Sequence, residues 1–206
     1  NGNLSIMQEG TSLYIMTNGE EISSIQGFDA TTIANNQNDW ADYSYDIIDN
    51  GIVADMSLVS DQVSNDGFGS IDNLIEIENI IGSKLADTIT GDSLNNTILG
   101  DDGADTIKGG AGNDSLDGGT SNDTIYGGEG ADIITGGANN DALYGGVQGV
   151  WTDSYDDTIN GDDGDDTIYA SFQADGADSG NTTADTIDGG VGNDTLNYSN
   201  FSAANA

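Results

Sequence analysis

Acidic residues recur at a fixed spacing through the second half of the chain. From Gly82 onward the sequence divides into consecutive nine-residue units, such as GDDGADTIK (100–108) and GGTSNDTIY (118–126). The eighth position of every unit is Ile or Leu, and this regularity indicates a true internal repeat, which decides the fold. The sixth position is acidic or the corresponding amide, at Asp87, Asn96, Asp105, Asp114, Asp123, Asp132, Asp141, Asp157, Asp166, Asp185 and Asp194.

The rest of the composition limits the chemistry open to these carboxylates. The 206 residues include 37 Asp and Glu but only two Lys and no Arg, so the formal charge is 2 − 37 = −35. Cys and His are absent, which excludes thiol nucleophiles, disulfides, His-dependent triads and zinc held by His or Cys. Oxygen ligands remain, and these are the ligands of Ca²⁺ or Mg²⁺. Nucleic acid is excluded as a partner, because phosphate binding needs Lys and Arg. The sequence contains no run of about 18 apolar residues, so no membrane-spanning helix is predicted.

The pattern of each unit predicts the element that positions its carboxylate. Gly at the first, second and often fourth positions permits the positive φ angles of a tight turn. The last three residues, polar–aliphatic–polar, predict a short strand whose central side chain points inward. One buried Ile or Leu contributes only about 2 kcal/mol, so a single unit cannot fold alone. We therefore expect two units to form one turn of a coil, with strands on opposite sides and parallel pairing between each unit and the next but one.

Stacking of such coils would gather the sixth-position carboxylates into two columns. The first column would hold Asp87, Asp105, Asp123, Asp141, Asp166 and Asp194, and the second Asn96, Asp114, Asp132, Asp157 and Asp185. Because paired strands lie only about 4.8 Å apart, these carboxylates repel one another strongly without a counterion. A Ca²⁺ ion between successive turns would relieve this repulsion, with two carboxylates and several turn carbonyls as ligands.

The units resemble the hemolysin-type calcium-binding (RTX) repeat, whose pattern is Gly-Gly-x-Gly-x-Asp-x-aliphatic-x. The resemblance covers residues 82–197, with insertions at about 145–156 and 170–184. It implies an all-β fold, a right-handed parallel β-roll, which is secreted unfolded by a type I system and folds in millimolar external Ca²⁺. In that family one turn contributes the carbonyls of its second and fourth residues and its sixth-position Asp. The turn two units later contributes the carbonyls of its first and third residues and its own Asp.

Carried over to this chain, the resemblance implies about five to eight Ca²⁺ ions. One site would combine Gly110, Gly112 and Asp114 with Gly127, Glu129 and Asp132, and another Gly119, Ser121 and Asp123 with Gly136, Ala138 and Asp141. The full set of implied metal-site residues is Asp87, Gly100, Asp102, Gly103, Asp105, Gly109, Gly110, Gly112, Asp114, Gly118, Gly119, Thr120, Ser121, Asp123, Gly127, Gly128, Glu129, Gly130, Asp132, Gly136, Ala138, Asp141, Asp157, Gly164, Asp166, Asp185, Gly189 and Asp194.

Three departures from the family pattern weaken particular sites. Asn96 cannot contribute a charge, so we expect the Asn96–Asp114 site to be weak or empty. The units 82–90 and 91–99 lack the double glycine and resemble the segment that leads into the roll in this family. The two insertions interrupt turn residues, so sites beside them need unusual ligands or are lost.

Residues 1–81 are predicted to form a β cap and the strands that lead into the roll, since solenoids need caps. Alternating segments at 4–7, 13–16, 22–28 and 51–58 predict strands, with turns at Glu9-Gly10 and Asn18-Gly19. Leu74 to Ile81 predicts a buried strand, and the polar segment 29–50 predicts a loop. The chain opens without Met or a signal segment, and residues 198–206 would begin a following segment, as expected of a module from a larger protein.

These features favour a non-enzymatic calcium-binding module, extracellular or on a bacterial cell surface. Its role would be to fold on binding Ca²⁺ and to stiffen an adhesin or surface layer, next to neighbouring modules of the same chain. One alternative is the non-catalytic module of a secreted protease, lipase or polysaccharide-modifying enzyme, since no Gly-x-Ser-x-Gly nucleophile elbow is present. Another is a roll that binds ice, a surface glycan or a protein through insertion residues such as Trp151, Tyr155 and Phe172. The third positions of the units show no regular file of Thr and Asn, which an ice-binding face would need.

Overall fold

The computed structural model describes residues 5–9, 12–16, 40–44, 50–58, 63–65, 74, 77–146, 155–169 and 185–197. Within these ranges every regular element is a β-strand, and no helix is long and apolar enough to cross a membrane. The strands are β1 (Ser5–Glu9), β2 (Ser12–Met16), β3 (Trp40–Asp42), β4 (Val53–Asp55), β5 (Val63–Asn65), β6 (Asn79–Ile81), β7 (Thr88–Thr90), β8 (Thr97–Leu99), β9 (Thr106–Ala111), β10 (Ser115–Thr120), β11 (Thr124–Glu129), β12 (Ile133–Ala138), β13 (Ala142–Tyr144), β14 (Thr158–Asp163), β15 (Thr167–Tyr169), β16 (Thr186–Asp188) and β17 (Thr195–Leu196).

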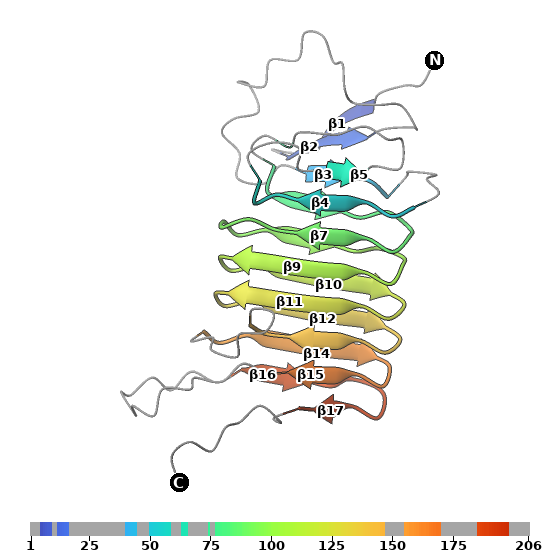
Figure 1. The fold of residues 1–206 in the computed structure, drawn as a ribbon, viewed down its shortest axis with the longest axis vertical. Coiled ribbons are helices and arrows are strands. Elements are labelled where there is room, and N and C mark those ends of the chain that lie inside the picture. Colours follow the sequence, from blue (N-terminus) through green and yellow to red (C-terminus); the bar gives the residue numbers. More distant parts are fainter. Residues whose placement is uncertain are drawn as a thin grey trace.

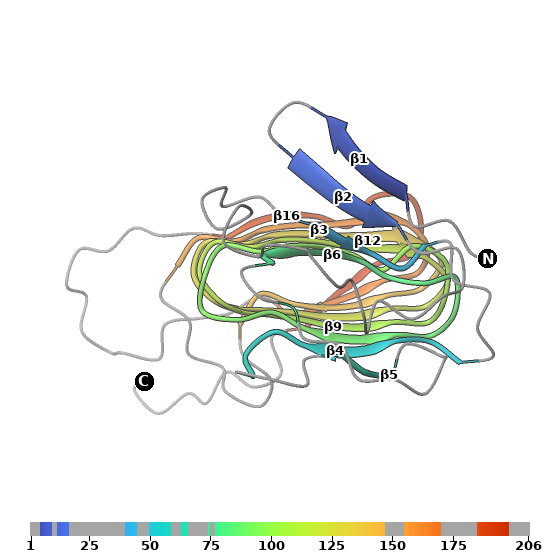
Figure 2. The ribbon, with the colours of Figure 1, turned by 90° about the horizontal axis from the view of Figure 1, so that it is seen from above.

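The strands form two sheets that face each other across a flattened coil. One sheet has the order β1-β2-β3-β6-β8-β10-β12-β14-β16, and the other β17-β15-β13-β11-β9-β7-β4-β5. Successive strands of the repeat alternate between the two sheets, so each coil uses two units (Figure 1). Seen from above, the coils superimpose as a flattened ring (Figure 2). The parallel β-roll predicted from the nine-residue units is therefore the fold of this chain.

Pairing within each sheet keeps equivalent positions of the units in register. Leu116 pairs with Ile98 on one side and with Ile134 on the other, in both cases the eighth position of the next unit but one. Across the insertions the pairs are Ile134–Ile159 and Ile159–Ile187, which again join eighth positions. The extra residues of the two insertions therefore leave the strand register undisturbed.

Two facing stripes of aliphatic side chains fill the roll. The eighth-position residues are at most 1% exposed from Ile89 to Ile168. The stripe weakens at the C-terminal end, where Ile187 is only partly buried and Leu196 is 39% exposed. Each unit thus contributes one side chain to a shared core, as the repeat pattern predicts.

The parallel stack begins before the first nine-residue unit. β3 pairs in parallel with β6, and β4 pairs in parallel with β7. The loop predicted over 29–50 is therefore wrong at Trp40–Asp42, because Ala41 and Tyr43 alternate inward and are buried in the same core. At the N-terminal end β1 and β2 form an antiparallel hairpin, as predicted at Glu9-Gly10. The turn at Asn18-Gly19 and the strand at 22–28 lie outside the described residues.

Candidate metal sites

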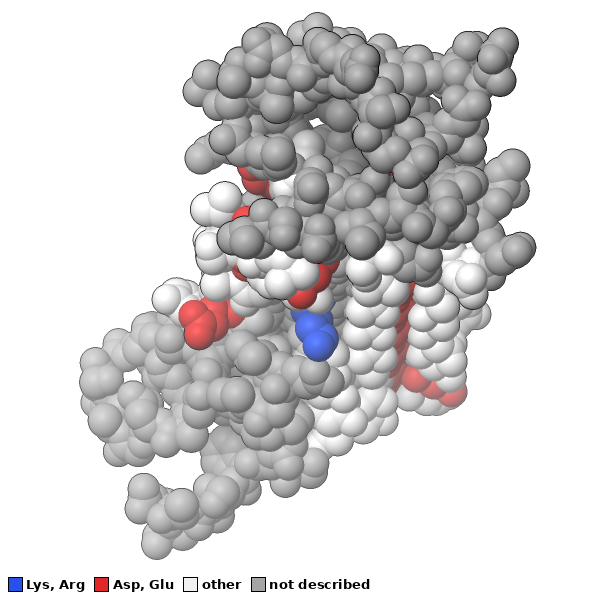
Figure 3. Space-filling model, turned by 45° about the horizontal axis from the view of Figure 1, so that its top comes forward, with Lys and Arg blue, Asp and Glu red and all other residues white. Residues whose placement is uncertain are grey.

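The sixth-position carboxylates lie in two columns, one along each edge of the roll where the chain turns between the sheets. Each column contains the members that the repeat spacing predicts, and we call them the first column (from Asp87) and the second column (from Asn96). The sixth-position residues from Asp87 to Asp166 are only 1–3% exposed. Figure 3 shows acidic side chains in a narrow stripe that follows the stacked coils. For any turn, the preceding turn and the following turn are its two neighbours in the same column.

One oxygen of each carboxylate is held by the preceding turn. The backbone N–H of Asp105 donates to Oδ1 of Asp123 at 2.8 Å, and the N–H of Asp123 donates to Oδ1 of Asp141 at 2.8 Å. The same bond continues past the insertions, from the N–H of Asp141 to Oδ1 of Asp166 at 2.8 Å. This repeated bond fixes the direction of the carboxylate and therefore the position of its second oxygen.

The second oxygen, Oδ2, is buried without a hydrogen-bond partner in much of the roll. Among the described residues this is the case for Oδ2 of Asp105, Asp114, Asp123, Asp141 and Asp166. Each of these oxygens faces the first glycine of its own turn and the carbonyl of the first residue in the following turn. A Cβ atom added to Gly100, for example, would collide with Oδ2 of Asp105 and with the carbonyl oxygen of Gly118. Buried oxygens left without donors are costly, so this arrangement points to a cation.

Backbone carbonyls of adjacent turns converge on the same space. At the second and fourth positions they point toward the following turn, so that the carbonyls of Gly110 and Gly112 face Gly128 and Gly130. At the first and third positions they point toward the preceding turn. The carbonyl of Gly127 faces Gly109, and that of Glu129 accepts the N–H of Gly112 at 2.8 Å. Oxygens of two turns therefore meet between the turns, as hard cations such as Ca²⁺ require.

The turn conformation that aims these carbonyls needs positive φ angles at the second and fourth positions. Most of these positions are glycine, for example Gly110 (φ 112°) and Gly112 (φ 108°). Where glycine is absent the backbone keeps the same conformation, at Asp101, Ser121, Asn139 and Asp162 (φ 65° to 86°). Asp and Asn tolerate this left-handed region better than other side chains, whereas Ser121 is strained in it.

Burial makes the charged form of these carboxylates unfavourable without a cation. Desolvation is the largest cause and raises the pKa of Asp105 to about 8, with the nearby charges of Asp87 and Asp123 adding to the effect. Burial likewise raises the pKa of Asp141 to about 7, and the pKa values of Asp114 and Asp123 to about 6. A bound divalent cation would reverse this preference by stabilising the carboxylate form.

The first member of each column is satisfied by the protein itself. Both oxygens of Asp87 accept hydrogen bonds, Oδ2 from the N–H of Ser83 (2.6 Å) and Oδ1 from the N–H of Ile52 and the hydroxyl of Ser83 (both 2.7 Å). Asn96 accepts the N–H of Asp92 at 2.9 Å and donates its Nδ2 to the carbonyl of Glu78 at 2.9 Å. The sequence did not predict the bond from Ile52 to Asp87, because Ile52 comes from a segment 35 residues away.

Not every residue of the predicted set directs its side chain into a column. Asp102 is exposed, accepts the hydroxyl of Thr120 at 3.0 Å and lies 3.8 Å from Lys84 Nζ. Asp185 and Asp194, near the C-terminal end, do lie in the columns, because Oδ1 of each accepts a backbone N–H of the preceding turn at 3.1 Å. Around the insertions, Tyr155 is 53% exposed, whereas Trp151 and Phe172 lie outside the described residues.

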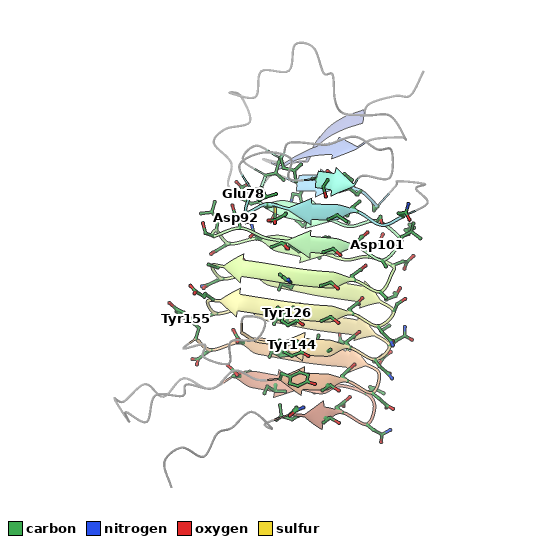
Figure 4. The ribbon with its side chains drawn as sticks, viewed as in Figure 1. Glu78, Asp92, Asp101, Tyr126, Tyr144 and Tyr155 are labelled. Carbon is green, nitrogen blue, oxygen red and sulfur yellow. The ribbon has the colours of Figure 1, made fainter. Side chains whose placement is uncertain are left out.

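Two further regular features emerge only once the units are stacked. Outward ninth-position rings form a stack in which Tyr144 lies between Tyr126 and Tyr169, with ring centroids 4.5 Å and 4.3 Å apart (Figure 4). Beside each carboxylate column, fifth-position side chains form a further row of hydrogen bonds. In one of them, Oδ1 of Asn95 accepts the N–H of Asn113 at 2.9 Å. The sequence signal for both is a residue type repeated at every second unit.

No group of three or more acidic side chains converges on one point in the described part of the chain. A cation would therefore need backbone carbonyls together with the carboxylates of two turns. The model of the RTX calcium-binding nonapeptide repeat matches residues 81–116, 90–124, 117–148, 150–177 and 179–200, which together span more than half of the chain. The chain belongs to this RTX family. It is thus a calcium-binding repeat module with a β-roll fold, and a search of curated proteins found no match to it.

Proposed function

We propose that Ca²⁺ ions bind between successive turns of each column and that this binding holds the roll folded. For the site between Asp114 and Asp132, the ligands would be the two carboxylates and the carbonyls of Gly110, Gly112, Gly127 and Glu129. The observation that carries this proposal is the buried, unpartnered Oδ2 of Asp114, which faces Gly109 and the carbonyl of Gly127. The directions of the four carbonyls also support it.

The same reasoning distributes ions along both columns. Successive carboxylates that could each share an ion are Asp105–Asp123, Asp123–Asp141, Asp141–Asp166 and Asp166–Asp194 in the first column, and Asp114–Asp132 and Asp132–Asp157 in the second. These pairs fall within the about five to eight ions expected from the repeat number. The pair Asp132–Asp157 lacks an uninterrupted following turn, so we expect its ion to be held more weakly.

Binding of this kind couples the metal to folding. At a formal charge of −35 the metal-free chain repels itself, and its buried carboxylates lose hydration on folding. Ions that bind only the folded roll stabilise it by mass action. We propose that the module serves as a Ca²⁺-dependent extender in a larger secreted or surface protein, where residues 1–81 cap and lead into the roll and residues 198–206 begin the next segment. Its role is structural and not catalytic.

The experiment that tests this proposal is a Ca²⁺ titration of the full chain, starting from metal-free buffer and followed by far-UV circular dichroism. We expect a cooperative transition from coil to β structure with Ca²⁺ and no such transition with Mg²⁺. Mg²⁺ demands a stricter octahedral geometry than the proposed sets of carbonyl and carboxylate ligands supply. A chain that is already fully folded in metal-free buffer, and whose spectrum Ca²⁺ leaves unchanged, would contradict the coupling of metal to folding.

A further inference from the structure

The fifth position of the unit, which varies between Asn, Asp and Ala, forms a side-chain column of its own. Oδ1 of Asn95 accepts the backbone N–H of Asn113 at 2.9 Å, and Oδ1 of Asn113 accepts that of Ala131 at 3.1 Å. In the other column the corresponding acceptors are Oδ1 of Asn122, Asn140 and Asp165, which hold the N–H groups of Asn140, Asp165 and Asn193 at 3.1, 2.8 and 2.9 Å. The side chains of Asn95, Asn113, Asn122 and Asn140 are exposed, so burial does not explain their presence.

Each of these bonds also sets the direction of a carbonyl. The N–H of a fifth residue and the C=O of the fourth residue belong to one planar trans peptide, so they point in opposite directions. A fifth-position N–H held by the preceding turn therefore directs the fourth-position carbonyl at the following turn. In the structure the carbonyl of Gly112 faces Gly130, and the carbonyl of Asn139 faces Gly164.

We propose that fifth-position Asn and Asp residues are positioning residues, which orient the fourth-position carbonyl ligand of the next Ca²⁺ site. This inference rests on the ligand set proposed above. Asn95 would orient the carbonyl of Gly112 at the site between Asp114 and Asp132. In the first column Asn122 would orient the carbonyl of Asn139 at the site between Asp141 and Asp166. Each positioning residue stands one turn before the site that it serves, and it touches no ion itself.

The chain contains its own comparison, because some turns lack this support. Residues 86 and 104 are alanine, which has no side-chain acceptor. The carbonyl of Ser121, proposed as a ligand between Asp123 and Asp141, belongs to the same peptide as the N–H of Asn122. By the register of β9 and β11, the equivalent residue of the preceding turn is Ala104. Ala104 is exposed, so Asn fits there. One site can thus lose its support by Asn95→Ala, and another can gain it by Ala104→Asn.

The test is nuclear magnetic resonance of the full chain at decreasing Ca²⁺ concentration, over the range in which circular dichroism shows that the roll is still folded. The ¹³C shifts of individual carbonyls then report the occupancy of each site. In Asn95→Ala we expect the Gly112 carbonyl to lose its Ca²⁺-dependent shift at a concentration about three- to tenfold higher than in the wild type, the factor expected for one hydrogen bond. The Asn139 carbonyl of the same molecules, in the other column, is the internal reference and should keep its midpoint. Asn95→Asp, which retains the acceptor, should restore the Gly112 midpoint, and Ala104→Asn should lower the midpoint of the Ser121 carbonyl.

A purely structural hydrogen bond predicts a different result. Its loss would lower the stability of the whole roll and would move the Gly112 and Asn139 midpoints together. Equal movement of the two midpoints, no movement in Asn95→Ala, or failure of Asn95→Asp to restore the wild-type value would each overturn the inference. A wild-type chain whose carbonyls show no Ca²⁺-dependent shift would instead overturn the ligand set on which it rests.

Discussion

The N-terminal units and the central units of the roll use the same fold but satisfy their sixth-position groups in different ways. In units 82–90 and 91–99, Asp87 and Asn96 find all their partners within the protein. In the central units, Asp105 and Asp123 accept one backbone N–H through Oδ1, while Oδ2 is buried and unpartnered. The first two units therefore satisfy these groups without an ion, whereas the central units leave a buried oxygen for which we propose a Ca²⁺ partner.

The difference comes from small sequence changes at the start of the repeat. Unit 82–90 has Ser83 where most central units have a second glycine, and its hydroxyl and N–H both donate to Asp87. Unit 91–99 has the amide of Asn96 at position six. Its Nδ2 donates to the backbone carbonyl of Glu78, and an ionised carboxylate at position six could not donate this bond. The N-terminal end can thus offer a folded edge on which metal-dependent coils stack, and Ca²⁺ dependence should grow from this end toward the centre.

The largest expected effect comes from removing a charge from the centre of the first column. Asp123→Asn keeps an oxygen that can accept the N–H of Asp105, but it removes a carboxylate proposed to be shared by two ions. We expect the Ca²⁺ midpoint of folding to rise by about tenfold or more, because the charge of the ligands tunes Ca²⁺ affinity over orders of magnitude. The measurement is circular dichroism during a Ca²⁺ titration.

Two controls sharpen this result. Asp102→Asn removes the same charge from an exposed side chain, so its midpoint should stay close to that of the wild type. Asp87→Asn should affect the metal-free stability of the N-terminal units more than the Ca²⁺ midpoint. If Asp87→Asn and Asp123→Asn raise the midpoint equally, the proposed division between the two regions is wrong.

The pH should act on the central units in opposite ways with and without metal. Burial raises the pKa of Asp105 to about 8 and that of Asp141 to about 7, above the value of about 3.9 for an unfolded chain. The metal-free folded roll therefore binds more protons than the unfolded chain between pH about 4 and pH about 8. Its stability is greatest below this window and falls as the pH rises through it, whereas Ca²⁺ affinity should rise over the same window.

Circular dichroism in metal-free buffer across this window tests the sign. We expect more β structure near the acidic end, and we expect the difference to persist at high salt, which screens exposed charges much more than buried ones. A β content that rises with pH in the absence of metal would contradict the assignment of buried, metal-dependent carboxylates. Loss of the effect at high salt would instead attribute it to the overall charge of −35.

The repeat itself could be predicted in detail because every unit carries the same information. The aliphatic stripe, the two carboxylate columns and the positions of both insertions all follow from the nine-residue spacing, since a parallel stack allows one register only. Residues outside the repeat gave no such constraint. Strand β3 has three residues, and its place in the sheet is decided by pairing with β6. A short, mostly polar segment carries no sequence pattern that predicts this pairing.

The contacts of individual turns were harder to foresee for a different reason. The bonds from Ser83 and Ile52 to Asp87, and from Asn113 to Asn95, join residues 4, 35 and 18 positions apart. Such bonds depend on which turns lie above one another and on which way each peptide plane faces. The fifth position is free to vary in the family pattern, so the pattern alone draws no attention to it.

Asn96→Asp tests the N-terminal side of the comparison and should have an effect whose sign depends on Ca²⁺. The new carboxylate would face the carbonyl of Glu78 without the donor that Nδ2 supplies, so at low Ca²⁺ we expect the N-terminal coils to be destabilised by about 1–3 kcal/mol. With Ca²⁺ the same carboxylate could share an ion with Asp114, and the first coils should become more stable than in the wild type. Urea unfolding at low and at saturating Ca²⁺ measures both signs, and a loss of stability under both conditions would rule out a new site.

The smallest expected effect concerns the backbone strain of a central turn. Ser121 holds a φ of 86° at the fourth position, where the neighbouring turns of the column have Gly103 or Asn139. Ser121→Gly removes the strain of a side chain in the left-handed region, which costs about 1–2 kcal/mol, but it also loosens the unfolded chain. We expect a net gain of about 0.5–1 kcal/mol in the Ca²⁺-saturated state. Ser115→Gly, in strand β10 and outside the turns, is the matched control and should destabilise, because there glycine relieves no strain and brings only the greater entropy of its unfolded chain. If both variants lose stability by the same amount, the positive φ of Ser121 is not a source of strain in the roll.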